Sequence, residues 1–161
     1  MKKIVFFVSA LLLIGVSACK EKKSQAPGEP TEFQLGLGAE DSTSIVKLGD
    51  ECMTYLKNGK IDEALGMLCQ YDDSLNEIAP LSEEQLASYK KKFLMFPVRE
   101  YQLAYFSFTE EGLNDLKYDV VFGPEAAGNP KTSYMFNPVK VNGEWHLSVK
   151  TAMQDVDEQM R

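Results

Sequence analysis

The chain has 161 residues, of which 44% are hydrophobic and 25% are charged. This length and polarity predict one globular domain and exclude a fibrous or wholly disordered chain. Lys and Arg number 17 against 24 Asp and Glu, which gives a formal net charge of −7. Nucleic acid is not an expected partner, because an acidic chain lacks the basic surface that a polyphosphate requires.

The first 19 residues follow the three-part plan of an exported protein. Lys2 and Lys3 precede an apolar run over residues 4–16, and two small residues come directly before Cys19. A helix over this run would be about 20 Å long, which is short of the ~30 Å hydrocarbon core of a bilayer. Residues 1–18 are therefore predicted to be a signal peptide and not a membrane span.

The sequence Val16-Ser17-Ala18-Cys19 resembles the lipobox of a bacterial lipoprotein. The resemblance implies cleavage before Cys19 and acylation of Cys19, which would tether the protein to a membrane of the cell envelope, in the first place the outer membrane, with the domain outside the cytoplasm. Burial of acyl chains contributes about 0.8 kcal/mol per CH₂, so several chains hold a protein firmly. The alternative is an ordinary cleaved signal peptide with an incidental cysteine.

The mature chain is more acidic than the precursor and begins with a predicted tether. Removal of Lys2 and Lys3 changes the formal charge from −7 to −9, and this charge should keep the body off an anionic lipid surface. Residues 19–41 carry the lipidated cysteine and then several prolines and glycines without a helical or strand period. A flexible tether of this length has a mean reach of about 26 Å.

Three helices are predicted between residues 42 and 96. Apolar residues at three- and four-residue steps predict helices over residues 42–56 and 61–69. The third begins at Ser82, because Ser82 and Gln85 form a capping box flanked by Leu81 and Leu86 at the positions of a hydrophobic staple. Pro97 ends this helix by residue 96.

After Pro97 the apolar period changes to two, which predicts strands over residues 98–109, 116–122, 131–141 and 144–152. Asn142-Gly143 is a strong hairpin signal between the last two. Pro138 cannot donate to a ladder and is expected on an edge or at a bulge. The order of elements predicts an α+β domain over residues 42–153, with three N-terminal helices packed on a curved four-stranded antiparallel sheet, and a tail over residues 154–161.

The segments 55–65 and 139–147 together resemble the nuclear-transport-factor-like fold, which is also called SnoaL-like and belongs to the cystatin-like superfamily. Many small bacterial lipoproteins of unknown function resemble it in the same way. The resemblance implies a cone-shaped sheet. It also implies that an enzyme of this fold would use one strand carboxylate as a proton-transfer base beside tyrosines. A cystatin-like sheet with one helix is the nearest alternative, and three helices before the strands argue against it.

Asp119 is the candidate for that catalytic base, although its alternation with Tyr118 is expected to point it away from an apolar interior. The single histidine, His146, excludes a two-histidine zinc motif, and neither a metal site nor a cofactor is expected. Cys52 and Cys69 lie on the apolar stripes of neighbouring helices. They are expected either as a disulfide or as two separate buried thiols.

Six residues are expected on the inner face of the sheet, either as packed core or as the lining of an opening at the wide end of the cone: Tyr101, Leu103, Tyr105, Tyr118, Phe122 and Trp145. The sequence thus predicts an envelope lipoprotein whose domain is a non-catalytic binding or interaction module. Its expected partners are a small apolar ligand, another envelope protein, or a second copy of the chain through the sheet face. The alternatives are an isomerase- or dehydratase-type enzyme on the same cone and a structural or assembly subunit.

Overall fold

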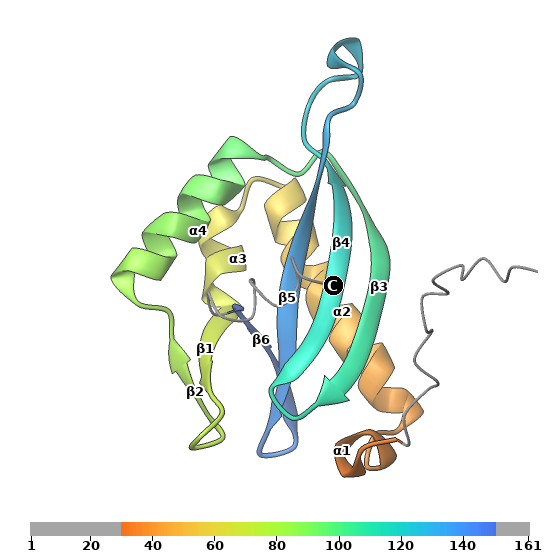
Figure 1. Cartoon of the computed structure of the whole chain (residues 1–161). Helices are drawn as coiled ribbons and strands as arrows, with labels where there is room; N and C mark the ends of the chain where they lie inside the picture. Colours follow the sequence, from red (N-terminus) through yellow and green to blue (C-terminus); the bar gives the residue numbers. More distant parts are fainter. Residues whose placement is uncertain (1–29, 151–161) are drawn as a thin grey trace, which may run out of the picture.

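The computed structural model describes residues 30–150, so the predicted signal peptide, Cys19 and the 154–161 tail lie outside the described residues. This part of the chain is an α+β domain with four α-helices and a mixed six-stranded sheet (Figure 1). The elements in chain order are α1 (Glu32–Leu35), α2 (Ala39–Lys57), α3 (Ile61–Gly66), β1 (Leu68–Asp72), β2 (Glu77–Pro80), α4 (Glu83–Met95), β3 (Glu100–Glu110), β4 (Leu113–Val121), the 3₁₀ turn η1 (Glu125–Ala127), β5 (Lys131–Val141) and β6 (Glu144–Ser148).

The sheet has the strand order β2-β1-β6-β5-β4-β3. Its neighbouring strands run antiparallel except for β1 and β6, which pair in parallel with Leu68 opposite Leu147. The prediction of four antiparallel strands was therefore incomplete, because β1 and β2 were missed. The second predicted helix ends at Gly66 and not at residue 69. Its last apolar residues fit a helix as well as a strand, and the long-range pairing of Leu68 beside Leu147 decides for the strand.

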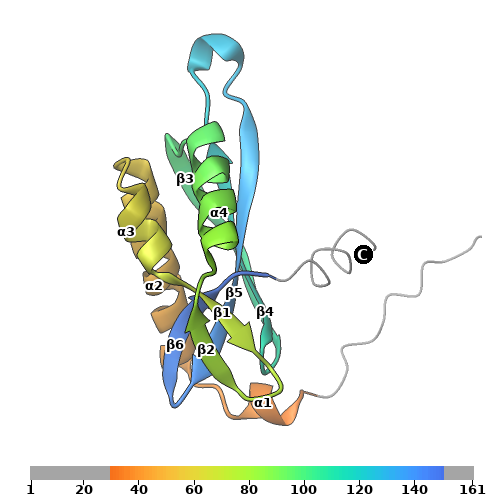
Figure 2. The same cartoon turned by 90° about the vertical axis from the view of Figure 1, so that its left-hand side faces the viewer.

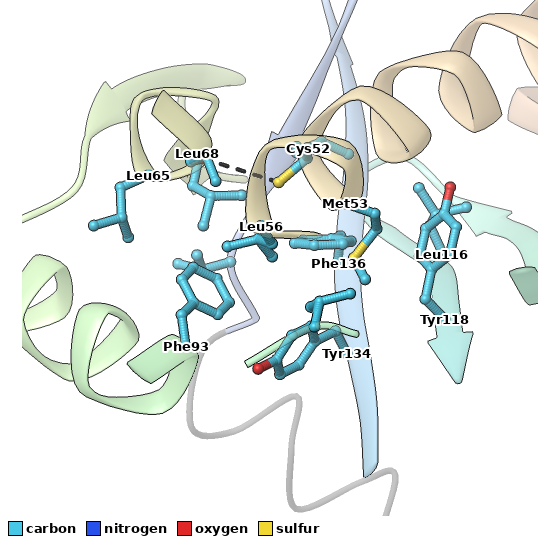
Figure 3. Close-up of a cluster of buried hydrophobic side chains, with 14 of the residues drawn as sticks. Cys52, Met53, Leu56, Leu65, Leu68, Phe93, Leu116, Tyr118, Tyr134 and Phe136 are labelled. Carbon is cyan, nitrogen blue, oxygen red and sulfur yellow. Dashed lines mark hydrogen bonds between the residues drawn. The ribbon is translucent and has the colours of Figure 1, made fainter. Parts of the chain in front are cut away.

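The helices α2 and α3 lie on one side of strands β3 to β5 (Figure 2). The apolar stripe of α2 predicted from the sequence is buried there, and Gly49 allows a close approach of the helix to the sheet. A Cβ atom at Gly49 would lie 2.5 Å from both Leu116 Cδ2 and Tyr118 Oη. The space between helices and sheet is filled (Figure 3) by buried side chains that include Cys52, Met53, Leu56, Leu65, Leu68, Phe93, Leu116, Tyr118, Tyr134 and Phe136.

The end of the predicted tether is folded, because α1 and the first turn of α2 lie within residues 32–41. Thr31 caps α1 in a capping box with Gln34. The Gln34 amide donates to the Phe108 carbonyl at 2.6 Å, and the Thr31 hydroxyl donates to the Thr109 carbonyl at 3.2 Å. These bonds attach α1 to the end of the edge strand β3, where the strand's carbonyls have no ladder partner on that side.

Asp41 attaches the start of α2 to the sheet. Its side chain is 6% exposed and accepts from Lys140 Nζ at 2.6 Å and from Trp145 Nε1 at 2.8 Å. The backbone N–H of Gly38 donates to the same carboxylate. The Lys140 bond is the main cause that lowers the pKa of Asp41 from its ordinary 3.8 to about 2, with the Gly38 bond next. Burial acts in the opposite direction.

Asp41→Asn is expected to lower the free energy of unfolding by about 2 kcal/mol at neutral pH, because three donors, on Lys140, Trp145 and Gly38, lose a charged acceptor. The pKa of Asp41 is lower in the folded state, so its contribution is complete above pH 3.8 and is lost as the pH falls towards 2. Urea unfolding at several pH values should show the difference between wild type and variant shrinking across that window. Asp119→Asn, at an exposed site, is the matched control.

A β-bulge in β3 changes which side chains face the helices. Leu103 pairs with Tyr118, but Tyr105 pairs with Lys117, so the register shifts between them. Tyr105 therefore lies on the outer face, where Lys117 Nζ is 5.7 Å from its ring centroid. The predicted alternation fails at this point. The expectation that β3 is covered on both faces is also wrong, since every residue of this edge strand is half-buried or exposed.

The backbone ladder between β4 and β5 ends at Leu116 and Phe136, and beyond that pair a buried network of polar side chains connects the two strands. The Asn137 amide donates to the Gly112 carbonyl at 2.8 Å and to the Ser148 hydroxyl at 2.9 Å, and its oxygen accepts from the Asn114 N–H at 2.8 Å. The Asn114 amide in turn donates to the Pro138 carbonyl. Pro138 is thus buried in a central strand and not at an edge, because side-chain amides replace the ladder beside it.

The β1–β2 hairpin curls back towards the turn between β3 and β4. Tyr71 packs so close to Gly112 that a Cβ atom there would lie 2.4 Å from the tyrosine ring, and Gly112 has a φ of +80°. The Asn76 amide donates to the Glu111 carboxylate at 3.0 Å. The two hairpins are therefore joined although they come from opposite edges of the sheet.

Candidate ligand-binding groove

A groove of about 690 Å³ lies between α3, β2 and α4, and the residues expected on the inner sheet face are not among those that line it. Asp62, Lys90 and His146 are its charged or titratable oxygen and nitrogen side chains. The other lining residues are small or apolar: Leu65, Gly66, Met67, Leu68, Cys69, Ile78, Ala79, Pro80, Leu81, Leu86 and Ala87. Ile78 and Leu86 are each 37% exposed and form accessible apolar walls.

The local sequence explains why these walls face each other. α3 is short and leads within two residues into β1, which places Leu65 beside the hairpin. The capping box of Ser82 and Gln85 starts α4 directly after β2. Both leucines line the groove, but Leu81 is buried and Leu86 is partly exposed. The predicted staple pair therefore becomes a floor residue and a wall residue.

The polar groups of the groove are few and mostly engaged. Lys90 Nζ and Asp62 Oδ1 form an ion pair of 2.7 Å that joins α4 to α3. Both side chains are well exposed, so the pair contributes at most about 1 kcal/mol. His146 is half-buried and reaches the groove from β6, on the strand face opposite Trp145 and Leu147. Among the charged or titratable oxygen and nitrogen side chains that line the groove, His146 is the one that comes from a strand.

The two cysteines are free thiols with separate surroundings. Cys69 lines the groove and its Sγ donates to the Leu147 carbonyl at 3.5 Å, and burial raises the pKa of this thiol to about 11. Cys52 lies in the core, where its Sγ donates to the Ala64 carbonyl at 3.9 Å and burial raises its pKa to about 12. Both thiols are protonated at neutral pH, so neither is an activated nucleophile.

The six residues expected at the inner sheet face do not line this groove. Tyr118 is completely buried and its hydroxyl donates to Asp50 Oδ1 at 2.9 Å, and burial is the main cause that raises its pKa. Tyr101 packs edge-on against Tyr118 and shares a hydrogen bond with Thr54. Leu103 and Phe122 pack against the core, Tyr105 faces outward, and Trp145 bonds to Asp41.

Asp119 lies on the outer face of the sheet. It is exposed, accepts a hydrogen bond from the Ser133 hydroxyl at 3.0 Å, and alternates with the buried Tyr118. It therefore does not face a tyrosine hydroxyl in an apolar interior, which the isomerase alternative requires. Within residues 30–150, no three His, Cys, Asp or Glu side chains are arranged to hold a metal ion. In the same residues, no helix combines the length and apolar character of a membrane span.

No protein-family model matches the chain, and no curated protein matches it. Two solved structures are similar to it. One is a Campylobacter jejuni protein whose assignment as an NTF2-like transpeptidase is provisional, with 14% identity and a TM-score of 0.38 over 71% of this chain and 100% of the other. The second is an NTF2-like protein of unknown function from Shewanella oneidensis MR-1, with 13% identity and a TM-score of 0.41 over 68% and 99%. These similarities are too distant to transfer a site or an activity.

Proposed function

We propose that this protein is an envelope-anchored lipoprotein whose domain binds a small apolar ligand, without catalysis, in the groove between α3, β2 and α4. The observation that carries the proposal is the groove itself. Its volume of about 690 Å³ lies within the roughly 300–1,000 Å³ of small-molecule sites, which are mostly apolar with a few polar groups. The lining of this groove has that composition.

The chemistry of the polar groups supports binding more than catalysis. The thiol of Cys69 is held in its protonated form, and Lys90 is paired with Asp62. Asp62 is the one carboxylate that lines the groove together with His146, and it is paired with Lys90. A ligand with a hydrocarbon body and one hydrogen-bonding group would match Leu65, Ile78 and Leu86 on one side and the imidazole on the other.

A second candidate function is the binding of another envelope protein at β2. This strand is at the edge of the sheet, and all four of its residues are exposed. An extended segment could add a strand there through main-chain hydrogen bonds. We also propose that the domain has the cone-shaped fold of nuclear-transport-factor-like proteins. In this protein the interior of the cone is filled by side chains, so the proposed binding sites lie outside it.

The ligand proposal is tested with N-phenyl-1-naphthylamine, whose fluorescence rises in an apolar site. The chain from residue 20 onward should bind the probe, and Leu86→Lys should weaken binding at least about tenfold, because a charge would be placed against the ligand. Leu94→Lys is the matched control, since Leu94 is on the same helix, is 62% exposed and does not line the groove.

Unfolding midpoints of the two variants should be similar, because both sites are accessible to water. Equal loss of binding in both variants, or no binding by the wild-type domain, would contradict the proposed site. If the probe does not bind but a partner protein is captured and Ile78→Pro abolishes that capture, the β2 edge would become the better candidate.

A further inference from the structure

The charges of the described domain are separated along its long axis. The β1–β2, β3–β4 and β5–β6 turns and α1 lie at the lower end in Figure 1, whereas the loop between β4 and β5 lies at the upper end. This end carries exposed acidic residues from four separate elements or their turns: Glu32, Asp72, Asp73, Glu110, Glu111 and Glu144. We name it the acidic end. Lys140 also lies near it, but that lysine is paired with Asp41.

The helices α2 and α4 finish and the strands β3 and β5 begin at the opposite end (Figure 1). The exposed residues there are mainly basic. Six exposed cationic residues lie there, and we name this surface the basic end: Lys57, Lys60, Lys91, Lys92, Arg99 and Lys131. Glu63, Glu100 and Glu125 are the exposed acids near them, while Asp62 and Lys90 are paired with each other. The basic end therefore has an excess of positive charge although the mature chain is strongly acidic.

The basic end also presents apolar surface. Leu94 is 62% exposed and Met95 is 56% exposed at the last turn of α4. An apolar depression of about 260 Å³ lies beside them, between the ends of α2 and α4, and Ile61, Leu94 and Pro97 are among its lining residues. Exposed apolar side chains ringed by lysines are the pattern of surfaces that dip into the interface of an anionic bilayer.

The two ends differ in their relation to the anchor. The chain enters the domain at Thr31, which caps α1 at the acidic end. The 19 residues of α2 alone separate this entry from the basic end by about 28 Å. An acidic surface is repelled by anionic lipid, whereas each lysine near such lipid contributes about 1 kcal/mol of attraction. If Cys19 is acylated as proposed, the acidic end is the one joined to the anchor, and the basic end is the end farther from it.

We propose that the basic end docks on the surface of an anionic phospholipid membrane opposite the one that carries the lipid anchor, so that the protein bridges two membranes. Lysines 57, 60 and 91 supply the attraction, and Leu94 and Met95 insert at the interface. The direction of this contact rests on the proposed anchoring at Cys19, but the contact does not depend on the groove.

The test uses the acylated protein reconstituted in vesicles of phosphatidylcholine. These donor vesicles are mixed with acceptor vesicles that contain about one quarter phosphatidylglycerol, and clustering is measured by light scattering and by energy transfer between labelled lipids. The donor vesicles should cluster with anionic acceptors and not with pure phosphatidylcholine acceptors. Clustering should fall when salt is raised from about 50 mM to about 300 mM, because exposed charges are then screened.

Lys57→Glu with Lys91→Glu should reduce clustering at least about tenfold, since two attractive charges become repulsive. Lys47→Glu with Lys117→Glu makes the same change of net charge in the middle of α2 and β4 and should leave clustering unchanged. Leu94→Ser with Met95→Ser should remove the part of the clustering that resists salt.

The failures can be told apart. Protein that does not stay with the donor vesicles would refute the anchor. Protein that stays with them but clusters no anionic acceptors, or loses clustering equally in both double charge variants, would overturn the proposed docking surface.

Discussion

Replacing Asn137 by leucine is expected to lower the free energy of unfolding by about 3 kcal/mol and the Tm by roughly 10 °C. Leucine has a similar size, but it leaves the buried N–H of Asn114 and the carbonyl of Gly112 without their partners. Asn137 is only 1% exposed, so water cannot replace these bonds. Urea and thermal unfolding followed by circular dichroism would measure the loss.

Ser133→Ala is the matched control for this prediction, because Ser133 lies on the same strand and its hydroxyl bonds only to the exposed Asp119. This variant should stay within about 0.5 kcal/mol of the wild type. A leucine variant at position 137 with wild-type stability would show that the amide network does not hold β4, β5 and the Gly112 turn together.

Replacing Cys19 by alanine is expected to abolish acylation completely, because alanine has no sulfur to carry the lipid. The full-length variant should accumulate as an unprocessed precursor with residues 1–18 still attached. Mass spectrometry of the N-terminal peptide and metabolic labelling with a fatty acid would measure both effects. The domain itself should fold as in the wild type, since residue 19 precedes the segment that the structure describes.

Cys69→Ala serves as the control for loss of a thiol, because Cys69 lies at the groove and should have no role in acylation. This variant should be acylated and membrane-bound like the wild type. Processed protein that still associates with the membrane after Cys19→Ala, without any fatty chain, would contradict the lipoprotein assignment.

The parts of the fold that local sequence determines were predicted well. The capping box of Ser82 and Gln85 is present at the start of α4, and the strand over residues 131–141 has the predicted bounds. Asn142 and Gly143 both have positive φ at the predicted hairpin. The α+β class is confirmed as well. In each of these cases the residues that decide the structure are neighbours in the chain.

The parts that depend on distant residues were not predicted. β1 pairs with the neighbouring β2 and also with β6, and no local pattern reports the pairing of Leu68 with Leu147. Tyr105 is turned outward by a bulge whose position depends on the register with β4. Pro138 is tolerated in a central strand because Asn114 on β4 bonds to the Pro138 carbonyl and to the side chain of the preceding Asn137.

The groove was missed for the same reason. Its walls come from α3, the β1–β2 hairpin and α4, and His146 arrives from the far end of the chain. From the sequence, we assigned Tyr118 and Trp145 to a possible ligand site because their side chains can form hydrogen bonds. In the structure these side chains bond to Asp50 and Asp41 of α2 and hold the helix against the sheet. One signal for the groove was available in the sequence. Leu86 is an apolar residue near the start of a helix, and the staple pattern led us to treat it as a packing residue and not as part of a binding site.

The parallel pairing of β1 with β6 affects the order in which parts of the domain fold. The β1–β2 hairpin forms one wall of the groove. Within residues 30–150, the strand that pairs with this hairpin is β6, which comes last in the chain. Contacts so far apart in the chain form late, since a long loop must close first. If the chain is exported from its N-terminus, as proposed, the groove would be complete only after β6 has emerged. The proposed ligand would then bind only on the far side of the membrane.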